Sequence, residues 1–293
     1  FYNSRNELNK DHLTALKIKL QKSNNASAKI FVVDKFVELY LKKNWKLLQR
    51  EEIWKELNLE FITQLDLLIE LLEIYLSYLD YLDFEISKIK AKPTALDAVP
   101  HLLSSYVLNF NYTNTSAYLF GTVEERTHFI HGRIDLDRTF NRINTMVFGI
   151  EDKENDVNSD LIPYQKYYQR VVKETGSEFE KFFSRTKYTK ENFSIPGRNI
   201  PISHRNPKNI VVFGHSVDPL DKEIFQKCFE LAENGKSDYR FIFTYFDEPA
   251  KRSIIKNLAI ILGKEKLIEL TGKRNVVFVK SDDKDGMEDV LLF

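Results

Sequence analysis

The sequence predicts an α/β protein with a mainly parallel sheet and flanking helices, plus a large α-helical hairpin or bundle region in its N-terminal third. From Ser105 onward, short runs rich in β-branched and aromatic residues alternate with helical patterns, which is typical of parallel strands joined by helices. Before that point the chain contains no glycine, and its first proline is Pro93. These two textures predict an α-helical region over residues 1–104 and an α/β domain over residues 105–293.

The N-terminal region gives its strongest signal between Phe61 and Ile89, where apolar residues alternate at spacings of four and three. This is the spacing of a coiled-coil seam, and the series comprises Phe61, Leu65, Leu68, Leu72, Tyr75, Leu79, Leu82, Ile86 and Ile89. A shorter series from Val37 to Leu48 offers a partner helix, with a bend over Gln49–Asn58. We expect an antiparallel helical hairpin. The alternative is a seam between two subunits, through which this region forms a homo-oligomer or binds a partner protein.

The remainder of the chain contains six runs that predict strands, at Tyr106–Phe110, His128–Ile130, Thr145–Ile150, Asn209–Phe213, Tyr239–Tyr245 and Asn275–Val279. Helical patterns separate several of them, at Leu161–Glu174, Pro219–Glu233 and Glu248–Leu270. Runs that are apolar throughout, such as Val211–Phe213 and Phe241–Phe243, fit central strands buried on both faces. Residues 187–208 hold three prolines and a glycine, which suits a surface loop.

The composition excludes several classes of protein. Lys plus Arg and Asp plus Glu both total 43, so the net charge of zero gives no general case for nucleic acid or an anionic membrane as partner. The longest apolar stretch, Leu65–Leu82, carries four acidic residues and does not resemble a membrane span. Cys228 is the only cysteine, which excludes a disulfide framework and a cysteine-rich metal site and fits the cytoplasm. The chain begins at Phe1 with no methionine and no signal peptide, so we expect residues upstream of it.

Three hydrophobic runs break into small polar residues, at Leu108–Thr115, His128–Arg133 and Val211–Asp218. In an open α/β sheet, ligands bind beyond the carboxyl ends of the strands. Motifs that follow separate strands can therefore meet in space although they lie far apart in the sequence. We expect these three segments to line one crevice.

The first segment offers polar side chains at Asn109, Asn111, Thr113 and Asn114. An amide both donates and accepts hydrogen bonds, which suits ribose hydroxyls or an attacking water. The alternative is a hydrogen-bonded turn with a cap for a helix over Ser116–Phe120. Asn111 is the best functional candidate because it lies nearest the strand end.

The second segment sets His131 and Gly132 directly after an apolar run. Histidine is the usual general base near neutral pH, and glycine lets a backbone approach a ligand closely. The alternative is a structural hydrogen-bonding histidine, and His128 ranks below His131. Asp135 and Asp137 would neutralise the surrounding arginines on a solvated face, or these arginines would meet a phosphate: Arg126, Arg133, Arg138 and Arg142.

The third segment runs from a strand through Gly214, His215 and Ser216 into a helix that starts near Pro219. Free amides point outward from a helix N-terminus, so this turn forms a natural anion site. Asp218 suits the N-cap position, with Pro219 as the first helical residue. The capping role and the binding role are compatible.

Together the three motifs resemble the signature segments of the AbiH family of bacterial phage abortive-infection proteins, at Phe110–Thr115, Ile130–Gly132 and Phe213–Lys222. AbiH proteins are in turn similar to the sirtuin-like Rossmann domains of several antiphage effectors. The resemblance covers residues 105–293 and implies a Rossmann-like core, with the helical region as an insert before the first motif. The family's N-terminal strand and glycine-rich loop have no counterpart in this sequence.

The resemblance also implies an NAD site, in which Asn111 and His131 match the family's asparagine and histidine and Gly214 and Ser216 match a Gly-x-Ser turn. The rest of the expected cofactor-binding set comprises Asn109, Thr113, Asn114, Gly132, Arg133, His215 and Asp218. Thr113 replaces an acidic residue and the zinc cysteines are missing, which argues against a zinc-dependent deacylase. We expect an antiphage effector that hydrolyses the N-glycosidic bond of NAD+ without a metal, with His131 as base and Asn111 positioning ribose or water.

Two other functions fit the same sequence. One is a non-catalytic nucleotide-sensing protein, in which the helical region oligomerises or recruits a partner in response to a phage trigger. The other is a nucleic-acid-cleaving effector, which would need a cluster of metal-binding carboxylates. The candidates for that cluster are Asp135, Asp137, Glu151 and Asp152.

Overall fold

The structure is a computed structural model that describes residues 10–42, 50–150, 161–183, 208–234 and 239–292. It divides into two compact units, one of residues 1–72 with 156–164 and the other of residues 73–155 with 165–293. Helix α3 (Arg50–Asp80) runs from the first unit into the second. The domain boundary that the sequence places after residue 104 stays a prediction.

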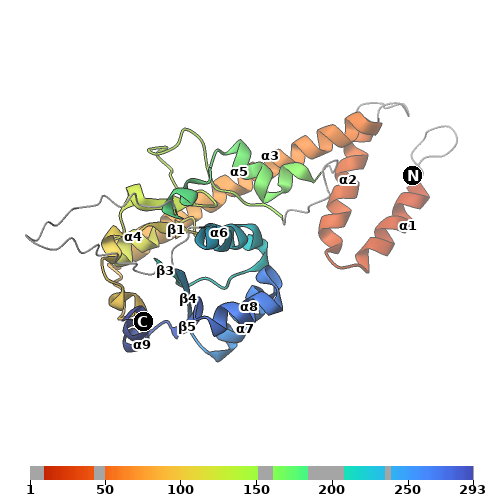
Figure 1. The fold of residues 1–293 in the computed structure, drawn as a ribbon. Helices are drawn as coiled ribbons and strands as arrows, with labels where there is room; N and C mark the ends of the chain where they lie inside the picture. The colour runs from red at the N-terminus through yellow and green to blue at the C-terminus, as the bar shows by residue number, and fades with distance from the viewer. Residues whose placement is uncertain (1–9, 43–49, 151–160, 184–207, 235–238, 293) are drawn as a thin grey trace, which may run out of the picture. The chain divides into compact units, whose positions relative to one another are not determined.

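The fold is mixed α/β, with long helices in the N-terminal third and short parallel strands beyond it (Figure 1). The described α-helices are α1 (Lys10–Gln21), α2 (Ala26–Lys42), α3, α4 (Thr115–Phe120), α5 (Lys166–Val172), α6 (Lys222–Asn234), α7 (Glu248–Leu262), α8 (Lys264–Gly272) and α9 (Lys284–Leu292). The described strands are β1 (Val107–Asn109), β2 (Thr127–Phe129), β3 (Lys208–Val212), β4 (Tyr239–Tyr245) and β5 (Val276–Lys280). Tyr81–Ile86 continues α3 as a π-helix, and short 3₁₀ helices include Ala95–Ala98, Ile162–Tyr164 and Pro219–Asp221.

In the first unit, α2 lies beside the first half of α3. The rings of Phe31 and Phe61 are 6.1 Å apart, and Lys35 pairs with Glu60 at 2.9 Å. This pairing fits the predicted hairpin, but the predicted bend is wrong because residues 50–58 form the first turns of α3. That stretch contains neither glycine nor proline, so nothing in it interrupts a helix. Residues 43–49, which include the end of the predicted partner helix, lie outside the described residues.

The burial pattern along α3 differs from the predicted seam. Leu68 and Tyr75 belong to that series and are 50% and 54% exposed, whereas Ile69 and Glu73 are buried. A helix with 3.6 residues per turn drifts relative to a 3.5-residue repeat, so one straight helix does not keep a long heptad series on one buried face. The π-helix at Tyr81–Ile86 shifts the phase again. A role for Phe61–Ile89 in binding a second subunit or another protein stays a prediction.

The second unit contains two parallel sheets. Strands β1 and β2 form one, with Val107 opposite Thr127, and β3, β4 and β5 form the other in that order. In the second sheet Phe241 lies opposite both Ile210 and Val276. Five of the six predicted strands therefore form, and all of their pairings are parallel. The single predicted sheet is present as two sheets within the described residues.

The strand predicted at Thr145–Ile150 is absent, because side chains occupy its backbone groups. Tyr112 Oη donates to the carbonyl of Val147 at 2.6 Å, and Gln169 accepts from the amide and donates to the carbonyl of Phe148 at 3.0 Å each. Among the described residues of this run, Ile150 forms an isolated bridge to Gln165, and the amide of Val147 donates to the carbonyl of His131 at 2.8 Å. A β-rich run does not form a strand when no neighbouring strand is left to pair with it.

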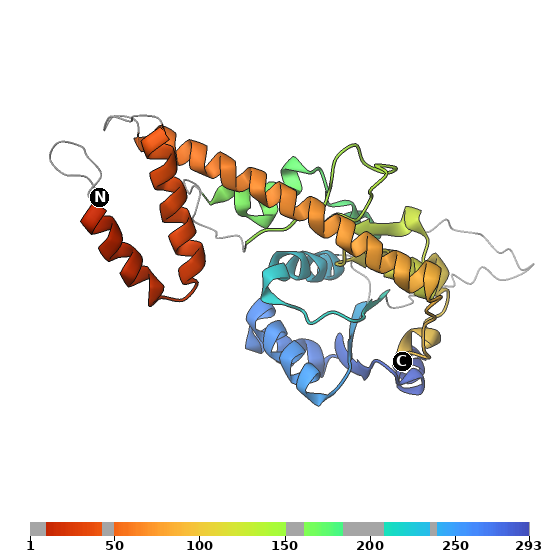
Figure 2. The same ribbon diagram turned by 180° about the vertical axis from the view of Figure 1, so that it is seen from behind.

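Helices cover both faces of the β3–β4–β5 sheet. Phe241 and Phe243 of β4 pack into a core with α6, α7 and α8, whereas Ile242 between them packs with Ala95 and with Met287 of α9. Figures 1 and 2 show α6, α7 and α8 grouped on one side of these strands and α9 apart from them. Burial on both faces explains why β4 is apolar throughout.

Two further predictions concern helices. The helix predicted over Glu248–Leu270 is interrupted at Gly263, whose φ of +86° ends α7 before α8 begins. No helix in the part of the chain that the structure describes is long and apolar enough to span a membrane. The predicted surface loop is described only at Lys208, and its other residues lie outside the described ranges.

Candidate functional site

The carboxyl ends of β1 and β2 bring the first two polar motifs together. Beyond the paired strands, the amide of Ile130 donates to the carbonyl of Asn109 at 3.0 Å, and the amide of Ile134 donates to the carbonyl of Tyr112 at 2.9 Å. The side chains that follow both strands therefore share one region, as the parallel arrangement requires.

The third motif meets the second through Asp221, at the end of the 3₁₀ turn before α6. Asp221 Oδ1 is 3.0 Å from His131 Nε2 and 2.9 Å from Lys166 Nζ, and Oδ2 is 3.5 Å from His215 Nε2. All four side chains are largely buried. We call His131, Lys166, His215 and Asp221 the Asp221 cluster. It joins groups from β2, α5 and β3 that lie up to 90 residues apart in the sequence.

The electrostatics of the Asp221 cluster favour an ionised carboxylate. Burial alone would raise the pKa of Asp221, but hydrogen bonds from His131, His215 and Lys166 outweigh it and hold that pKa well below its usual range. The phenol of Tyr112 lies close to Asp221. Burial, reinforced by the negative charge of Asp221, raises the pKa of Tyr112 to about 12. Asp221 is therefore charged near neutral pH, and Tyr112 is a neutral phenol.

The ionised carboxylate fixes the tautomers of both histidines. A carboxylate only accepts hydrogen bonds, so Nε2 of His131 carries the proton that faces it. Nδ1 of His131 is buried and has no hydrogen-bond partner among the described residues. His215 has the same tautomer, because its Nδ1 accepts from the amide of Val217 at 2.8 Å. Nδ1 of His131 is thus an acceptor nitrogen that receives no hydrogen bond within the part of the chain that the structure describes.

The ring of Phe110 contacts both histidines. The centroid of Phe110 is 4.4 Å from that of His215, 5.9 Å from that of His131 and 5.4 Å from that of Phe225. These rings exclude water from one side of the cluster, which strengthens each hydrogen bond within it.

The turn after β3 stores backbone strain. Val217 has a φ of +56° although it is β-branched and fully buried, a conformation that costs about 1–3 kcal/mol. Its amide bonds to His215, and Asn257 donates to the carbonyl of Ser216 at 3.1 Å, which holds the turn in place. Gly214 has a φ of +67°, and a Cβ on it would meet nothing within 4 Å among the described residues. Within that part of the chain, the backbone at Gly214 is therefore open to an approaching ligand.

Gly132 has the opposite environment. Its φ is +76°, and a Cβ would come within 1.9 Å of the carbonyl oxygen of Thr145. The amide of Val147 donates to the carbonyl of His131, and that of Arg133 donates to Thr145 Oγ1. Glycine is needed here for close approach of the 145–147 segment, which fixes the backbone on either side of His131.

The polar residues after β1 divide into a structural and an accessible group. Asn109 is buried, accepts from the amide of Asn111 at 2.8 Å and donates to the carbonyl of Thr113 at 3.1 Å, so it shapes the turn. Thr113 bonds to Thr115, and Asn114 precedes α4 without a side-chain cap. Asn111 is exposed at the end of this turn. Among these residues Asn111 is free to meet a ligand, and Asn109 supports it.

The arginines near the second motif are engaged within the chain. Arg133 pairs with Glu124 and stacks on Phe129 and Phe140. Arg138 makes two hydrogen bonds to the buried Glu73, at 2.7 and 2.9 Å. Arg126 donates to the carbonyl of Ser104, and Arg142 is exposed. The structure thus gives Arg133 and Arg138 structural partners rather than leaving them open to a phosphate.

The structure also places the remaining predicted residues, apart from those outside the described ranges. Asp218 caps the turn as expected, accepting from the amide of Leu220 at 2.9 Å with Pro219 in the first position. Asp135 accepts three backbone amides, and Asp137 is exposed. Glu151 and Asp152 lie outside the described residues, and the described part of the chain contains no group of acidic, histidine or cysteine side chains arranged to hold a metal.

Sequence reasoning missed Asp221 and Lys166. Asp221 lies inside the third motif, but an acidic residue in the first turn of a helix is ordinary. Lys166 follows a run with no motif at all. The available signal was the position of Asp221 three residues after an N-cap, directly beyond the predicted histidine turn.

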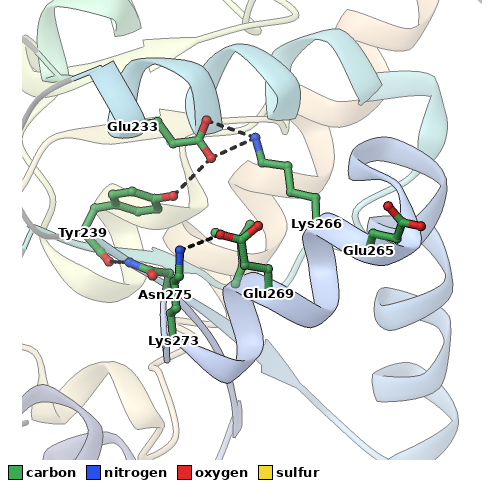
Figure 3. Close-up of a pocket in the computed structure, with 8 residues that line it drawn as sticks. Glu233, Tyr239, Glu265, Lys266, Glu269, Lys273 and Asn275 are labelled. Carbon is green, nitrogen blue, oxygen red and sulfur yellow. Dashed lines mark hydrogen bonds and ion pairs between the residues drawn. The ribbon is translucent and has the colours of Figure 1, made fainter.

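A surface hollow at the other end of the sheet contrasts with this cluster. Figure 3 shows Glu233, Lys266, Glu269 and Lys273 around Tyr239, the first residue of β4, and Asn275, which precedes β5. Lys266 pairs with Glu233 at 2.8 Å, and Lys273 pairs with Glu269. These charges neutralise one another at the amino ends of the strands. We call this set the amino-end hollow.

Comparison with known proteins gives one finding. The family model for bacteriophage abortive infection AbiH matches residues 9–245. Neither a curated protein nor a solved structure matches the chain.

Proposed function

Because the chain belongs to the AbiH family of bacteriophage abortive infection proteins, we propose that it is an antiphage effector that hydrolyses the N-glycosidic bond of NAD+. Abortive infection is the function that the family suggests, and NAD+ depletion is the proposed means. The observation that carries the proposal is the pair formed by His131 and Asp221, an oriented histidine at the carboxyl ends of parallel strands.

A sirtuin-like Rossmann core supports nucleotide binding in this proposal. Parallel strands with helices on both faces bind ligands beyond their carboxyl ends, where Gly214 is open and Asn111 is exposed. The two described sheets share one apolar core, since Phe110 beyond β1 packs against the cluster formed by β3, β4 and α6. The dinucleotide would lie along the turn at Gly214–Ser216 and reach Asn111 and His131.

The chemistry requires a base and oriented polar groups more than a strong nucleophile. The bond between nicotinamide and C1′ of ribose breaks, the electron pair leaves with neutral nicotinamide, and water bonds to C1′ through an oxocarbenium-like state. Once bound substrate uncovers Nδ1 of His131, which is buried in the described structure, that nitrogen takes the proton from water, and the amide of Asn111 positions water or the ribose hydroxyls. No step calls for a metal.

The same proposal assigns a role to the helical region. It makes the contact with a second subunit or partner protein that responds to a phage trigger, with the effector acting in the cytoplasm. Leu71 and Ile74, neighbours on one face of α3, are 62% and 55% exposed, which supports an interaction along Phe61–Ile89.

The test replaces His131 with glutamine, which still donates a hydrogen bond to Asp221 but is not a base near neutral pH. We expect purified protein to release nicotinamide and ADP-ribose from NAD+, and His131→Gln to lose at least about 100-fold of that rate. In cells carrying the variant, NAD+ should persist after phage challenge. Chromatography of nucleotides gives both readouts.

The matched control is His101→Asn, because His101 is exposed, lies outside the Asp221 cluster and has a φ of +58° that asparagine tolerates. It should retain the rate of the unaltered protein. Undiminished NAD+ loss in His131→Gln would reject His131 as the base, and absence of turnover in the unaltered protein would reject the reaction.

One observation favours a second candidate, a non-catalytic nucleotide sensor. Nδ1 of His131 is covered in the described structure, which suits a cluster that a ligand rearranges on binding. This function predicts that NAD+ or ADP-ribose binds with measurable heat and is recovered unchanged. Calorimetry followed by product analysis separates the two functions.

A further inference from the structure

One oxygen of Asp221 serves two donors. His131 Nε2 and Lys166 Nζ lie 3.0 and 2.9 Å from the same Oδ1, whereas His215 faces Oδ2 at 3.5 Å. The groups that face Asp221 thus come from the ends of β2 and β3 and from α5, with Tyr112 beyond β1 as a further neighbour. The carboxylate is the point at which all these elements are tied together.

The shared oxygen decides which nitrogen of His131 is basic. Held to an acceptor through Nε2–H, the ring presents Nδ1 as its acceptor. Without that acceptor the ring is free to take the other tautomer, in which Nδ1 carries the proton. In a serine protease triad, the worked case in which the carboxylate is replaced by an amide, the wrong tautomer alone costs about 10⁴-fold in rate.

Lys166 bears on the charge of the His131 ring. A histidine beside a lone buried carboxylate tends to take up a proton, because the opposite charge favours imidazolium. An imidazolium donates from both nitrogens and is no longer a base. The ammonium of Lys166, on the oxygen that faces His131, cancels the charge that would drive this protonation.

We propose that Asp221 and Lys166 are positioning residues: Asp221 holds His131 in the tautomer whose Nδ1 accepts a proton, and Lys166 keeps that ring uncharged. This role rests on the proposed function of His131 as a base. Neither residue touches the substrate. The cluster therefore sets the tautomer and the charge of His131, so that Nδ1 is the proton acceptor.

The first test reads the tautomer directly and needs no activity. Two-bond proton–nitrogen NMR on histidine-labelled protein, with the His131 signals assigned from His131→Gln, should show a protonated Nε2 and a bare Nδ1. In Asp221→Leu no acceptor faces Nε2, so the proton should move to Nδ1 in a measurable fraction of the rings, with circular dichroism checking that the variant is folded. Asp282→Leu, which removes an exposed carboxyl paired with Lys280, is the matched control and should leave the spectrum unchanged.

A protonated Nδ1 in the unaltered protein, or an unchanged tautomer in folded Asp221→Leu, would overturn the role of Asp221. This readout stands even if NAD+ is not the substrate, so failure of the reaction and failure of the positioning role are distinguishable.

The second test concerns Lys166. The acid side of the pH–rate profile for NAD+ hydrolysis should move to higher pH in Lys166→Met, by about one unit or more, and return in Lys166→Arg. The pH at which the His131 ring shifts change in NMR should move in the same way without any substrate. Lys227→Met, an exposed lysine on α6, is the control. An unmoved titration in Lys166→Met would overturn the role of Lys166.

Discussion

The Asp221 cluster lies at the carboxyl ends of β2 and β3, the amino-end hollow lies at the amino ends of β4 and β5, and the two have opposite characters. In the cluster, one buried carboxylate receives three donors from separate elements. In the hollow, two glutamates and two lysines pair on a half-exposed surface, and Figure 3 shows them around Tyr239. The hollow has the more evident concave shape, but the cluster has the buried charge.

This difference shows what marks a functional site. Paired charges in water attract one another weakly, because solvent screens them. Buried charges carry a large desolvation cost and persist only where their geometry is well satisfied. Groups perturbed by burial together with specific partners are the ones that enzymes use. Burial and convergence of elements, rather than concavity, therefore make the carboxyl end the stronger candidate for a functional site.

The largest expected effect comes from removing the carboxylate of the cluster. Asp221→Ala leaves Lys166 and two histidines buried without their acceptor, so the free energy of unfolding should fall by about 3–5 kcal/mol. The equivalent change in the hollow, Glu233→Ala, should cost less than about 1 kcal/mol. Urea denaturation followed by circular dichroism measures both. Equal losses would remove the distinction between the two regions.

The next effect separates the two glycines of the carboxyl end. Gly132→Ala drives a Cβ against the backbone of Thr145, in addition to its positive φ, and should cost about 2–4 kcal/mol of unfolding free energy. Gly214→Ala meets no atom and should cost only about 1 kcal/mol. Since its methyl group enters open space, Gly214→Ala should fold and bind NAD+ more weakly, as calorimetry can show. A folded Gly214→Ala with unchanged affinity would move the ligand away from that turn.

The sequence predicted the strands that are defined by their own composition. β4 matches its prediction at both ends, because a strand buried on both faces is apolar throughout and its alternate residues enter two different cores. Thr145–Ile150 has a similar β-rich composition, yet the side chains of Tyr112 and Gln169 form hydrogen bonds with its backbone groups. Such competition depends on distant residues, and no local pattern reports it.

The candidate site shows the same contrast between local sequence patterns and contacts with distant residues. His131, His215 and Gly214 follow strands, so the rule that ligands bind at carboxyl ends makes them candidates from the sequence alone. Arg133 carries the right chemistry for a phosphate, but Glu124 lies against it in the fold. Asp221 contacts His131 and Lys166 only because the fold brings β2, β3 and α5 together. Residues at strand ends are predictable, whereas the partners that orient them are not.

A smaller effect concerns pH. The pKa of Asp221 is lowered in the folded protein, so its stabilising contribution is present above its unfolded pKa of about 3.9 and is lost as pH falls through the folded value. The stability difference between the protein and Asp221→Ala should therefore persist down to about pH 4 and shrink below it. Denaturation at a series of pH values measures this. A difference that vanished already well above pH 4 would show that the carboxylate is not held ionised by its three donors.

The smallest effect on stability is expected from a substitution in the amino-end hollow. This substitution is also the control for the comparison between the hollow and the Asp221 cluster. Glu269 is fully exposed, and although its hydrogen bond to Lys273 lowers the pKa of Glu269, solvent screens the pair. Glu269→Gln should leave the unfolding midpoint unchanged in about 0.15 M salt, where the Debye length is about 8 Å, and NAD+ hydrolysis should continue at the unaltered rate. If Glu269→Gln instead weakened nucleotide binding while Asn111→Ala did not, the ligand would belong at the amino ends of the strands. The Asp221 cluster would then be a structural tie between β2, β3 and α5, because burial alone gives a charged group a role in stability, and a role in catalysis requires contact with a ligand or with a residue that contacts it.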